Sequence, residues 1–227
     1  MTIASELPVT GAKLAMEHPE QAVVCLGGQT VDSTPDGWYV DEAIQTVPLP
    51  AIPAGETQLS ISLPFGIQSA VEWCYLLGDF GVALSGAQAR LCPPVRSLRF
   101  GDIVPQGLPF YTGSLTYHCR ADAAGSCRLR IPSFQAPVLR AALDGQDMGR
   151  IAFAPYTLSL GTLDDRSHTL DITAFGNRHN GFGPIHRAGG LTGGYGPGEW
   201  FTEGPARTDE YVLRPNGILT PPLLEVL

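Results

Sequence analysis

Short segments in which apolar and polar residues alternate recur through this 227-residue chain, and they constrain its fold more than any other feature. Residues 58–63 (QLSISL) alternate strictly, and residues 168–175 repeat the pattern with Leu170, Ile172 and Ala174. A period of two is typical of strands that bury one face. The 27 glycines and 20 prolines supply turns between such strands. The sequence therefore predicts an all-β chain of the β-sandwich or jelly-roll type.

A stretch rich in glycine and proline, residues 101–113 (GDIVPQGLPFYTG), lies near the middle of the chain and precedes a regular series of predicted strands. Residues 96–227 contain enough of these strands for a complete β-sandwich, including a hairpin at Asp144-Gly145. Residues 1–95 contain fewer. The sequence therefore predicts two modules, of which the first is incomplete.

Two segments of the chain resemble each other. Six apolar positions around the turn at residues 53–58 match six positions around residues 164–169 at one constant offset. The pairs are 47 and 158, 49 and 160, 52 and 163, 59 and 170, 61 and 172, and 63 and 174. Upstream, Gly28-Gln29 matches Gly145-Gln146. Such a pattern indicates a duplicated unit, although any two strand-turn-strand segments of equal length would produce part of it.

The duplication raises a question about the first module. The second copy has two predicted strands, residues 113–120 and 127–131, before its hairpin, and the first copy has only about twenty residues for their equivalents. Either residues 1–20 supply a missing strand, or a segment outside this chain completes the module by covering its open edge. The second alternative describes the C-terminal portion of something larger.

Composition excludes some classes of function. The net charge of −8 disfavours nucleic acid as a partner, and no apolar run has the length of a membrane span. The N-terminus lacks the pattern of a signal peptide, so a cytoplasmic location is favoured. The five cysteines form no CxxC pair, which disfavours structural zinc. Cys119 and Cys127 flank a predicted hairpin turn, where two free thiols are favoured over a disulfide.

Two pieces of sequence are similar to a known family. Residues 73–82 (WCYLLGDFGV) and 107–117 (GLPFYTGSLTY) resemble the C-terminal β-sandwich region of large bacterial glycoside hydrolases, which carries a sugar-binding domain of the glycoside hydrolase family 2 type. Shorter matches extend the resemblance over roughly residues 22–227. They are residues 143–146 (LDGQ), 154–156 (APY), 176–180 (GNRHN), 183–186 (GPIH), 208–213 (TDEYVL) and 217–219 (GIL).

The resemblance implies a galactose-binding-domain-like jelly roll for residues 96–227 and a partial jelly roll for residues 1–95. It also implies that catalysis takes place in another domain of a larger glycosidase, which this chain would contact. No cofactor follows from it, and a calcium ion supporting a loop stays an open alternative.

The sequence identifies no catalytic residue. Glycoside hydrolysis needs two carboxylates about 5 to 10 Å apart. The acidic residues in apolar or glycine-rich surroundings are Glu72, Asp79, Asp102, Glu199 and Asp209. For Glu72 and Asp79 a buried group that satisfies loop backbone is favoured, and Asp102 and Asp209 are expected to accept neighbouring backbone N–H groups in turns. His179 and His186 lie seven residues apart without a third metal ligand at suitable spacing.

Sugar binding requires an aromatic face and a few polar side chains. Two segments hold these ingredients. The candidates in the long loop at residues 176–198 and just after it are His179, Asn180, Arg187, Tyr195, Glu199 and Trp200. The candidates in the earlier segment are Trp38 and Tyr39, next to acidic residues. The alternative for these aromatic residues is that they close the ends of a sandwich or dock on a catalytic domain.

The sequence thus predicts a non-catalytic carbohydrate-binding or architectural β-sandwich portion of a bacterial glycoside hydrolase. Two further classes stay open. In one, this chain contributes residues to a glycosidase active site that another domain completes. In the other, the chain is a purely structural or oligomerisation module, and a homo-oligomer would form.

Overall fold

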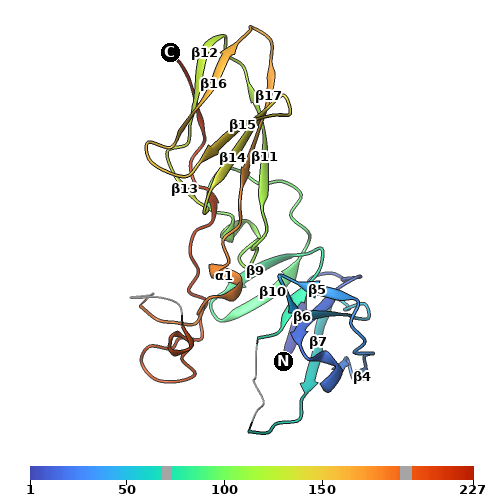
Figure 1. The fold of residues 1–227 in the computed structure, drawn as a ribbon. Helices are drawn as coiled ribbons and strands as arrows, with labels where there is room; N and C mark the ends of the chain where they lie inside the picture. Colours follow the sequence, from blue (N-terminus) through green and yellow to red (C-terminus); the bar gives the residue numbers. More distant parts are fainter. Residues whose placement is uncertain (68–72, 190–195) are drawn as a thin grey trace. The chain divides into compact units, whose positions relative to one another are not determined.

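The chain folds almost entirely into β-strands, which confirms the prediction of an all-β protein. The computed structural model describes residues 1–67, 73–189 and 196–227. The chain forms two compact units, Met1–Val95 and Arg96–Leu227 (Figure 1). Helical structure in the described residues is limited to the α-helical turn α1 (His179–Phe182) and the 3₁₀ turns η1 (Pro19–Gln21), η2 (Val104–Gln106) and η3 (Pro197–Glu199).

The first unit is a sandwich of two sheets. The strand order is β4-β3-β7-β1-β10-β9 in one sheet and β5-β6-β2-β8 in the other, and the pairing of β1 with β10 is parallel. The strands are β1 (Thr2–Ser5), β2 (Lys13–Glu17), β3 (Val23–Leu26), β4 (Gln29–Thr30), β5 (Gly37–Tyr39), β6 (Asp41–Pro48), β7 (Gly55–Ser62), β8 (Tyr75–Leu77), β9 (Gly81–Ser85) and β10 (Gln88–Cys92). Leu14 and Val47 of one sheet share a buried core with Val24 and Leu59 of the other.

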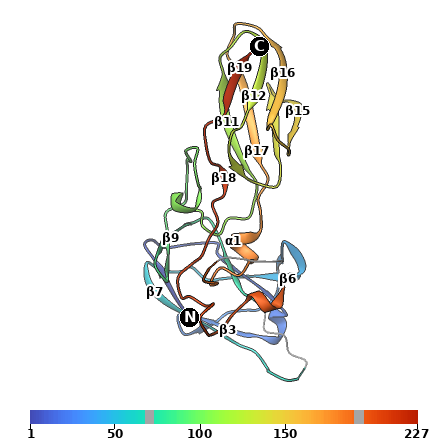
Figure 2. The ribbon, with the colours of Figure 1, turned by 90° about the vertical axis from the view of Figure 1, so that its left-hand side faces the viewer.

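The second unit is a sandwich of the same kind. Its sheets have the orders β11-β17-β14-β15 and β16-β12-β19, and β13 pairs with β18 in a short ladder. Figure 2 shows β12 beside β16 and β19. The strands are β11 (Leu115–Ala121), β12 (Gly125–Arg130), β13 (Phe134–Gln135), β14 (Leu139–Leu143), β15 (Gln146–Ile151), β16 (Thr157–Leu163), β17 (His168–Ala174), β18 (Gly217–Ile218) and β19 (Leu223–Val226). The alternation predicted for β17 is present, because His168, Leu170, Ile172 and Ala174 are all buried.

The two units have the same topology, as the predicted duplication requires. In the first unit, β7 lies between β3 and β1, and β3 forms a hairpin with β4. In the second unit, β17 lies between β14 and β11, and β14 forms a hairpin with β15. In the opposing sheets, β2 lies between β6 and β8, and β12 lies between β16 and β19. Seven strands of each unit therefore correspond in order, direction and partner.

The strand registers support the same alignment residue by residue. Leu59 lies opposite Leu26 in the first unit, and Leu170 lies opposite Leu143 in the second. The residue after each of these partners donates its backbone N–H to the neighbouring strand at 2.8 Å: Gly27 to the carbonyl of Gln58, and Asp144 to the carbonyl of Thr169. The match at positions 59 and 170 therefore reflects shared structure and not only equal spacing.

This correspondence decides the question of the early strands. Residues 1–20 contain both β1 and β2, which match β11 and β12 of the second unit. Of the two alternatives, the structure therefore shows the first, in which residues 1–20 supply early strands of the first module. Sequence pattern did not reveal them because β1 has only four residues and β2 is buried at three consecutive positions, so neither shows a clean alternation.

The connection between Cys119 and Cys127 is not a hairpin. Cys119 lies in β11 and Cys127 in β12, and these strands belong to opposite sheets, so the turn between them crosses the sandwich. All five cysteines are free thiols. Burial raises the pKa of Cys119, and the negative charge of Asp171 raises it further. The favoured interpretation of two free thiols is thus confirmed.

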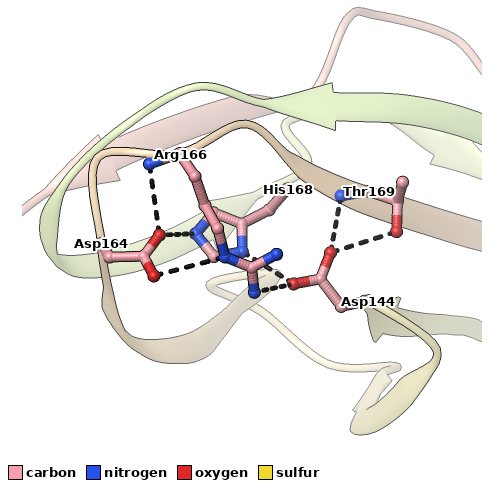
Figure 3. A network of polar contacts seen from close by, with 5 residues as sticks. All are labelled: Asp144, Asp164, Arg166, His168 and Thr169. Carbon is pink, nitrogen blue, oxygen red and sulfur yellow. Dashed lines mark hydrogen bonds and ion pairs between the residues drawn. The ribbon is translucent and has the colours of Figure 1, made fainter.

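A charged cluster joins two turns of the second unit (Figure 3). Asp144, in the β14–β15 turn, accepts hydrogen bonds from the backbone N–H of Thr169 at 2.9 Å and from Arg166 at 2.7 Å. His168 is 4% exposed. Its Nδ1 lies 2.8 Å from Asp144 Oδ2 and its Nε2 lies 3.0 Å from Asp164 Oδ1. The imidazole therefore lies between two carboxylates, an arrangement that favours its protonated form.

The titration of this cluster is linked to the stability of the fold. The hydrogen bond with Asp144 raises the pKa of His168 above its ordinary value, against the effect of burial. The same hydrogen bond is the largest cause that holds the pKa of Asp144 well below its ordinary value. The first unit has a glycine, Gly27, where the second has Asp144, and Thr57 where the second has His168. The charged cluster is therefore specific to the second copy.

We predict that the chain loses stability as the pH rises above about 6.5, the ordinary pKa of histidine. A raised folded-state pKa means that the stabilisation from His168 is fully present below that value and is lost as the pH passes through the raised pKa. The lowered pKa of Asp144 has the opposite sign, so its contribution is present above about pH 4 and is lost only in stronger acid. His168→Gln should lower the unfolding temperature at pH 6 and flatten its decline between pH 6 and 9, measured by calorimetry.

The matched control is His118→Gln. The side chain of His118 is 78% exposed and also lies 2.8 Å from a carboxylate, that of Asp171, so its loss should change the unfolding temperature little at either pH. Identical pH profiles for His168→Gln and the unaltered chain would contradict the linkage.

Candidate functional site

A pocket of about 540 Å³ opens in the second unit, beside α1 and the β13–β18 ladder. Aromatic rings, two arginines, a histidine and amide side chains line it. The lining residues are Gln135, Ala136, Pro137, Asn177, Arg178, His179, Phe182, Gly183, Trp200, Arg214 and Pro215. The pocket has the size and mixed lining of sites that bind small molecules, which are typically about 300–1,000 Å³.

One wall of the pocket comes from the pairing of β13 with β18. Phe134 lies opposite Ile218 and Gln135 lies opposite Gly217. The ladder brings the segment that follows β13 next to Arg214 and Pro215, which precede β18. This pairing spans more than eighty residues of sequence, so the wall exists only once the whole unit has folded.

A second part of the lining comes from α1, a single helical turn held at both ends. The side-chain oxygen of Asn177 accepts a hydrogen bond from the backbone N–H of His179 at 3.1 Å, and the N–H of Gly183 donates to the carbonyl of His179 at 2.7 Å. Asn180, which is 2% exposed, holds the chain at Arg214 by accepting from its backbone N–H at 2.9 Å and donating to its carbonyl at 2.8 Å. The two walls are thereby fixed to each other.

The glycine-rich stretch at residues 101–113 supports the base of this arrangement. Asp102 Oδ1 accepts hydrogen bonds from the backbone N–H groups of Val104 and Asn216, each at 3.0 Å. The side chain of Asn216 accepts from Asn177 Nδ2 at 3.1 Å and donates to the carbonyl of Tyr111 at 3.3 Å. The role predicted for Asp102, accepting neighbouring backbone N–H groups, is confirmed.

The ionised side chains that line the pocket are positive although the protein is acidic. Among the described lining residues there are two arginines, Arg178 and Arg214, and no carboxylate. Burial lowers the pKa of His179 below its ordinary value, and the positive charge of Arg214 lowers it further. The imidazole is therefore neutral at pH 7, and the positive charge of the pocket comes from the two guanidinium groups.

Trp200 contributes an aromatic surface and an unused donor. The side chain is half-buried, and its buried Nε1 atom has no hydrogen-bond partner among the described residues. An indole N–H is a donor only, so a ligand with an oxygen acceptor would satisfy it. Just before it, Glu199 forms an ion pair with Arg187, whose guanidinium lies 5.3 Å from the centre of the Phe201 ring.

The structure brings some of the predicted sugar-binding residues together. His179 and Trp200 line the pocket, and Asn180 lies behind its wall with its amide used by the backbone of Arg214. Glu199 directly precedes Trp200 in the chain and forms an ion pair with Arg187, but neither of these two residues lines the pocket. Direct contact between these residues and a sugar stays a prediction.

The remaining predicted residues lie elsewhere. Tyr195 lies outside the described residues. Trp38 and Tyr39 belong to β5 of the first unit, where the Trp38 side chain is 58% exposed and the Tyr39 ring lies 5.8 Å from that of Tyr75. They do not share the pocket described here.

Sequence reasoning missed most lining residues of the pocket, and those with polar or aromatic side chains are Gln135, Asn177, Arg178, Phe182 and Arg214. Three of them lie within the loop that the sequence singled out, but they gave no separate signal. Gln135 and Arg214 reach the pocket through the two-residue ladder of β13 and β18, which is too short to show a strand pattern.

A second hollow, of about 680 Å³, lies beside the charged cluster of Asp144, Arg166 and His168. The charged groups there pair with one another at 2.7 to 2.8 Å. Their bonding capacity is thus largely used within the protein. The pocket beside α1 is the stronger candidate because its guanidinium groups face no carboxylate among the described lining residues.

The acidic residues considered from the sequence do not converge on either hollow. Asp102 supports the backbone, Glu199 pairs with Arg187, and Asp209 pairs with Arg207. Asp79 is exposed in the first unit, and Glu72 lies outside the described residues. His186 packs against the Tyr211 ring at 4.8 Å between ring centres. In the described residues, no group of three or more His, Cys, Asp or Glu side chains is arranged to hold a metal ion.

Comparison with known proteins gives little independent guidance. No family model matches the chain. No curated protein matches it either. The chain is similar to part of a solved structure, the rhamnosidase from Novosphingobium sp. PP1Y, with 18% identity and a TM-score of 0.37. That match covers 97% of this chain and 22% of the rhamnosidase chain. No helix among the described residues is long and apolar enough to cross a membrane.

We predict that Gly176 is required for the pocket. A Cβ atom at this position would lie 2.1 Å from the carbonyl oxygen of Thr112 and 2.3 Å from that of Gly113. Both are backbone atoms, so Gly176→Ala must displace either β17 or the support of α1. We expect a loss of roughly 1–3 kcal/mol in the free energy of unfolding, as for other overpacked sites.

The control is Gly198→Ala, where an added Cβ would meet no atom of the described residues within 4 Å. Its effect on denaturant unfolding should stay within about 0.5 kcal/mol. Equal stability of the two variants would show that the segments at Gly176 and Thr112 do not pack as described.

Proposed function

We propose that this chain is a carbohydrate-binding β-sandwich portion of a larger bacterial glycoside hydrolase, and that it binds sugar in the pocket beside α1. The observation that carries the proposal is the meeting of Trp200 and Phe182 with Gln135, Arg178 and Arg214 in one pocket. The resemblance of residues 73–82 and 107–117 to sugar-binding regions of such enzymes supports the same class of ligand.

The chemistry of the lining suits a pyranose ring. One face of a pyranose presents C–H groups, which pack on an aromatic surface such as Trp200 or Phe182. The rim of hydroxyl groups needs both donors and acceptors, and a neutral His179 together with the amide of Gln135 offers both. Hydroxyl oxygens would also satisfy the indole N–H of Trp200.

Binding is favoured over hydrolysis at this pocket. A glycosidase needs a carboxylic acid and a second carboxylate near the scissile bond, and the described lining residues include neither. Under the proposal, the catalytic groups belong to another domain of the enzyme. The alternatives of a shared active site and of a purely structural module make different predictions in the experiment below.

We predict that Trp200→Ala weakens the binding of sugars by about tenfold, because ring stacking contributes about 0.5–1.5 kcal/mol. Calorimetric titration with a panel of neutral and acidic mono- and oligosaccharides measures the affinity. Tryptophan fluorescence of a Trp38→Phe variant reports on binding with less background from the first unit.

The matched control is Trp38→Ala, which removes an exposed tryptophan of the first unit and should leave the affinity unchanged. The absence of binding across the whole panel would sink the proposal and favour a structural module. Turnover of aryl-glycosides by the isolated chain would instead support a catalytic role.

A further inference from the structure

We infer that the pocket beside α1 selects sugars that carry a negatively charged substituent, such as the carboxylate of a uronic acid or a sulfate ester. This inference rests on the proposed carbohydrate-binding function and specifies its ligand class. It comes from the two guanidinium groups of Arg178 and Arg214, which the fold brings to one pocket from segments about 36 residues apart.

The positive lining is not a consequence of overall composition. The chain has 14 lysine and arginine residues and 22 acidic residues. Among the described residues that line the pocket, however, there are two arginines and no carboxylate. Many other arginines of the second unit pair with acids, such as Arg128 and Arg130 with Glu225, and Arg166 with Asp144. The pocket departs from this pattern, and an anionic ligand would supply the charge that the lining lacks.

The backbone of each arginine is held in place while its side chain reaches solvent. The carbonyl of Arg178 accepts a hydrogen bond from the N–H of Phe182 at 2.8 Å, and Asn180 holds both backbone groups of Arg214. Both arginines are exposed residues. A fixed backbone lowers the entropy that is lost when a guanidinium binds a ligand.

Arginine suits this task because its planar group forms paired hydrogen bonds with a carboxylate or a sulfate. In the resulting arrangement, the sugar ring packs on Trp200 and its anionic group faces Arg178 and Arg214. His179 stays neutral at pH 7 and contacts hydroxyl groups rather than adding charge. The aromatic surface and the charged rim together distinguish a sugar acid from a free inorganic anion, which lacks the ring.

The test compares glucuronic acid oligosaccharides and glucose 6-sulfate with the corresponding neutral glucosides, by calorimetry at low ionic strength. Inorganic sulfate serves as the probe for a free anion. We expect the anionic sugars to bind at least about tenfold more tightly than the neutral ones. The preference should shrink at high salt and should be lost in the double variant Arg178→Gln, Arg214→Gln.

The matched control is Arg150→Gln, which removes an exposed arginine of β15 that does not line the pocket. This variant should keep the preference for anionic sugars. Equal affinity for neutral and anionic sugars would overturn the inference and leave the proposed function standing. Binding of inorganic sulfate as tight as that of the sugar acids, or an unchanged preference in the double variant, would also overturn it. The absence of any sugar binding would overturn both.

Discussion

The hydrogen bond between Asp102 and Asn216 holds together the part of the second unit on which the candidate site depends. These residues are 114 positions apart, and the carboxylate of Asp102 accepts the backbone N–H of Asn216. Asn216 is 5% exposed and in turn contacts Asn177, Gly217 and Tyr111. A buried polar group is costly unless it is fully paired. This node therefore requires three distant segments to meet at once, and the walls of the pocket extend from those same segments.

The two units share one strand topology but differ in the side chains and short elements that it supports. Their shared strands bury similar alternating apolar residues. Gly27 and Asp144, at equivalent positions, each donate a backbone N–H to the neighbouring strand. The differences lie in the side chains placed on that frame. The second unit has a charged cluster around His168 where the first has Thr57, and it adds the β13–β18 ladder and α1 beside the end of the sandwich. Stability comes from the common frame, whereas the recognition proposed here depends on the additions.

The fold class and the duplication could be predicted from the sequence because both depend on local pattern. The alternation in β17 and the hairpin at Asp144-Gly145 are properties of adjacent residues. The early strands β1 and β2 could not be predicted, since their burial depends on partners that are distant in the sequence, such as Ile44 for Glu17 and Gly55 for Ser5. The pocket could be predicted from the sequence only in part, for the same reason. His179 and Trp200 lie in a loop with a recognisable composition, but Gln135 and Arg214 reach the pocket through a pairing of two residues on each side.

The parallel pairing of β10 with β1 has a consequence for how such sheets grow. In the first unit, the β9–β10 hairpin follows the seven shared strands in sequence and attaches beside β1. In the second unit, β11 occupies the equivalent position and is the last strand of its sheet among the described residues. The β9–β10 hairpin thus makes one sheet of the first unit longer, and the order of the strands that both units share is the same. The margin of the sandwich at β1 and β11 is therefore a place where this architecture accommodates extra strands, and the edge of the opposite sheet is another, because β5 pairs with β6 in the first unit and no strand of that sheet pairs with β16 in the same way among the described residues.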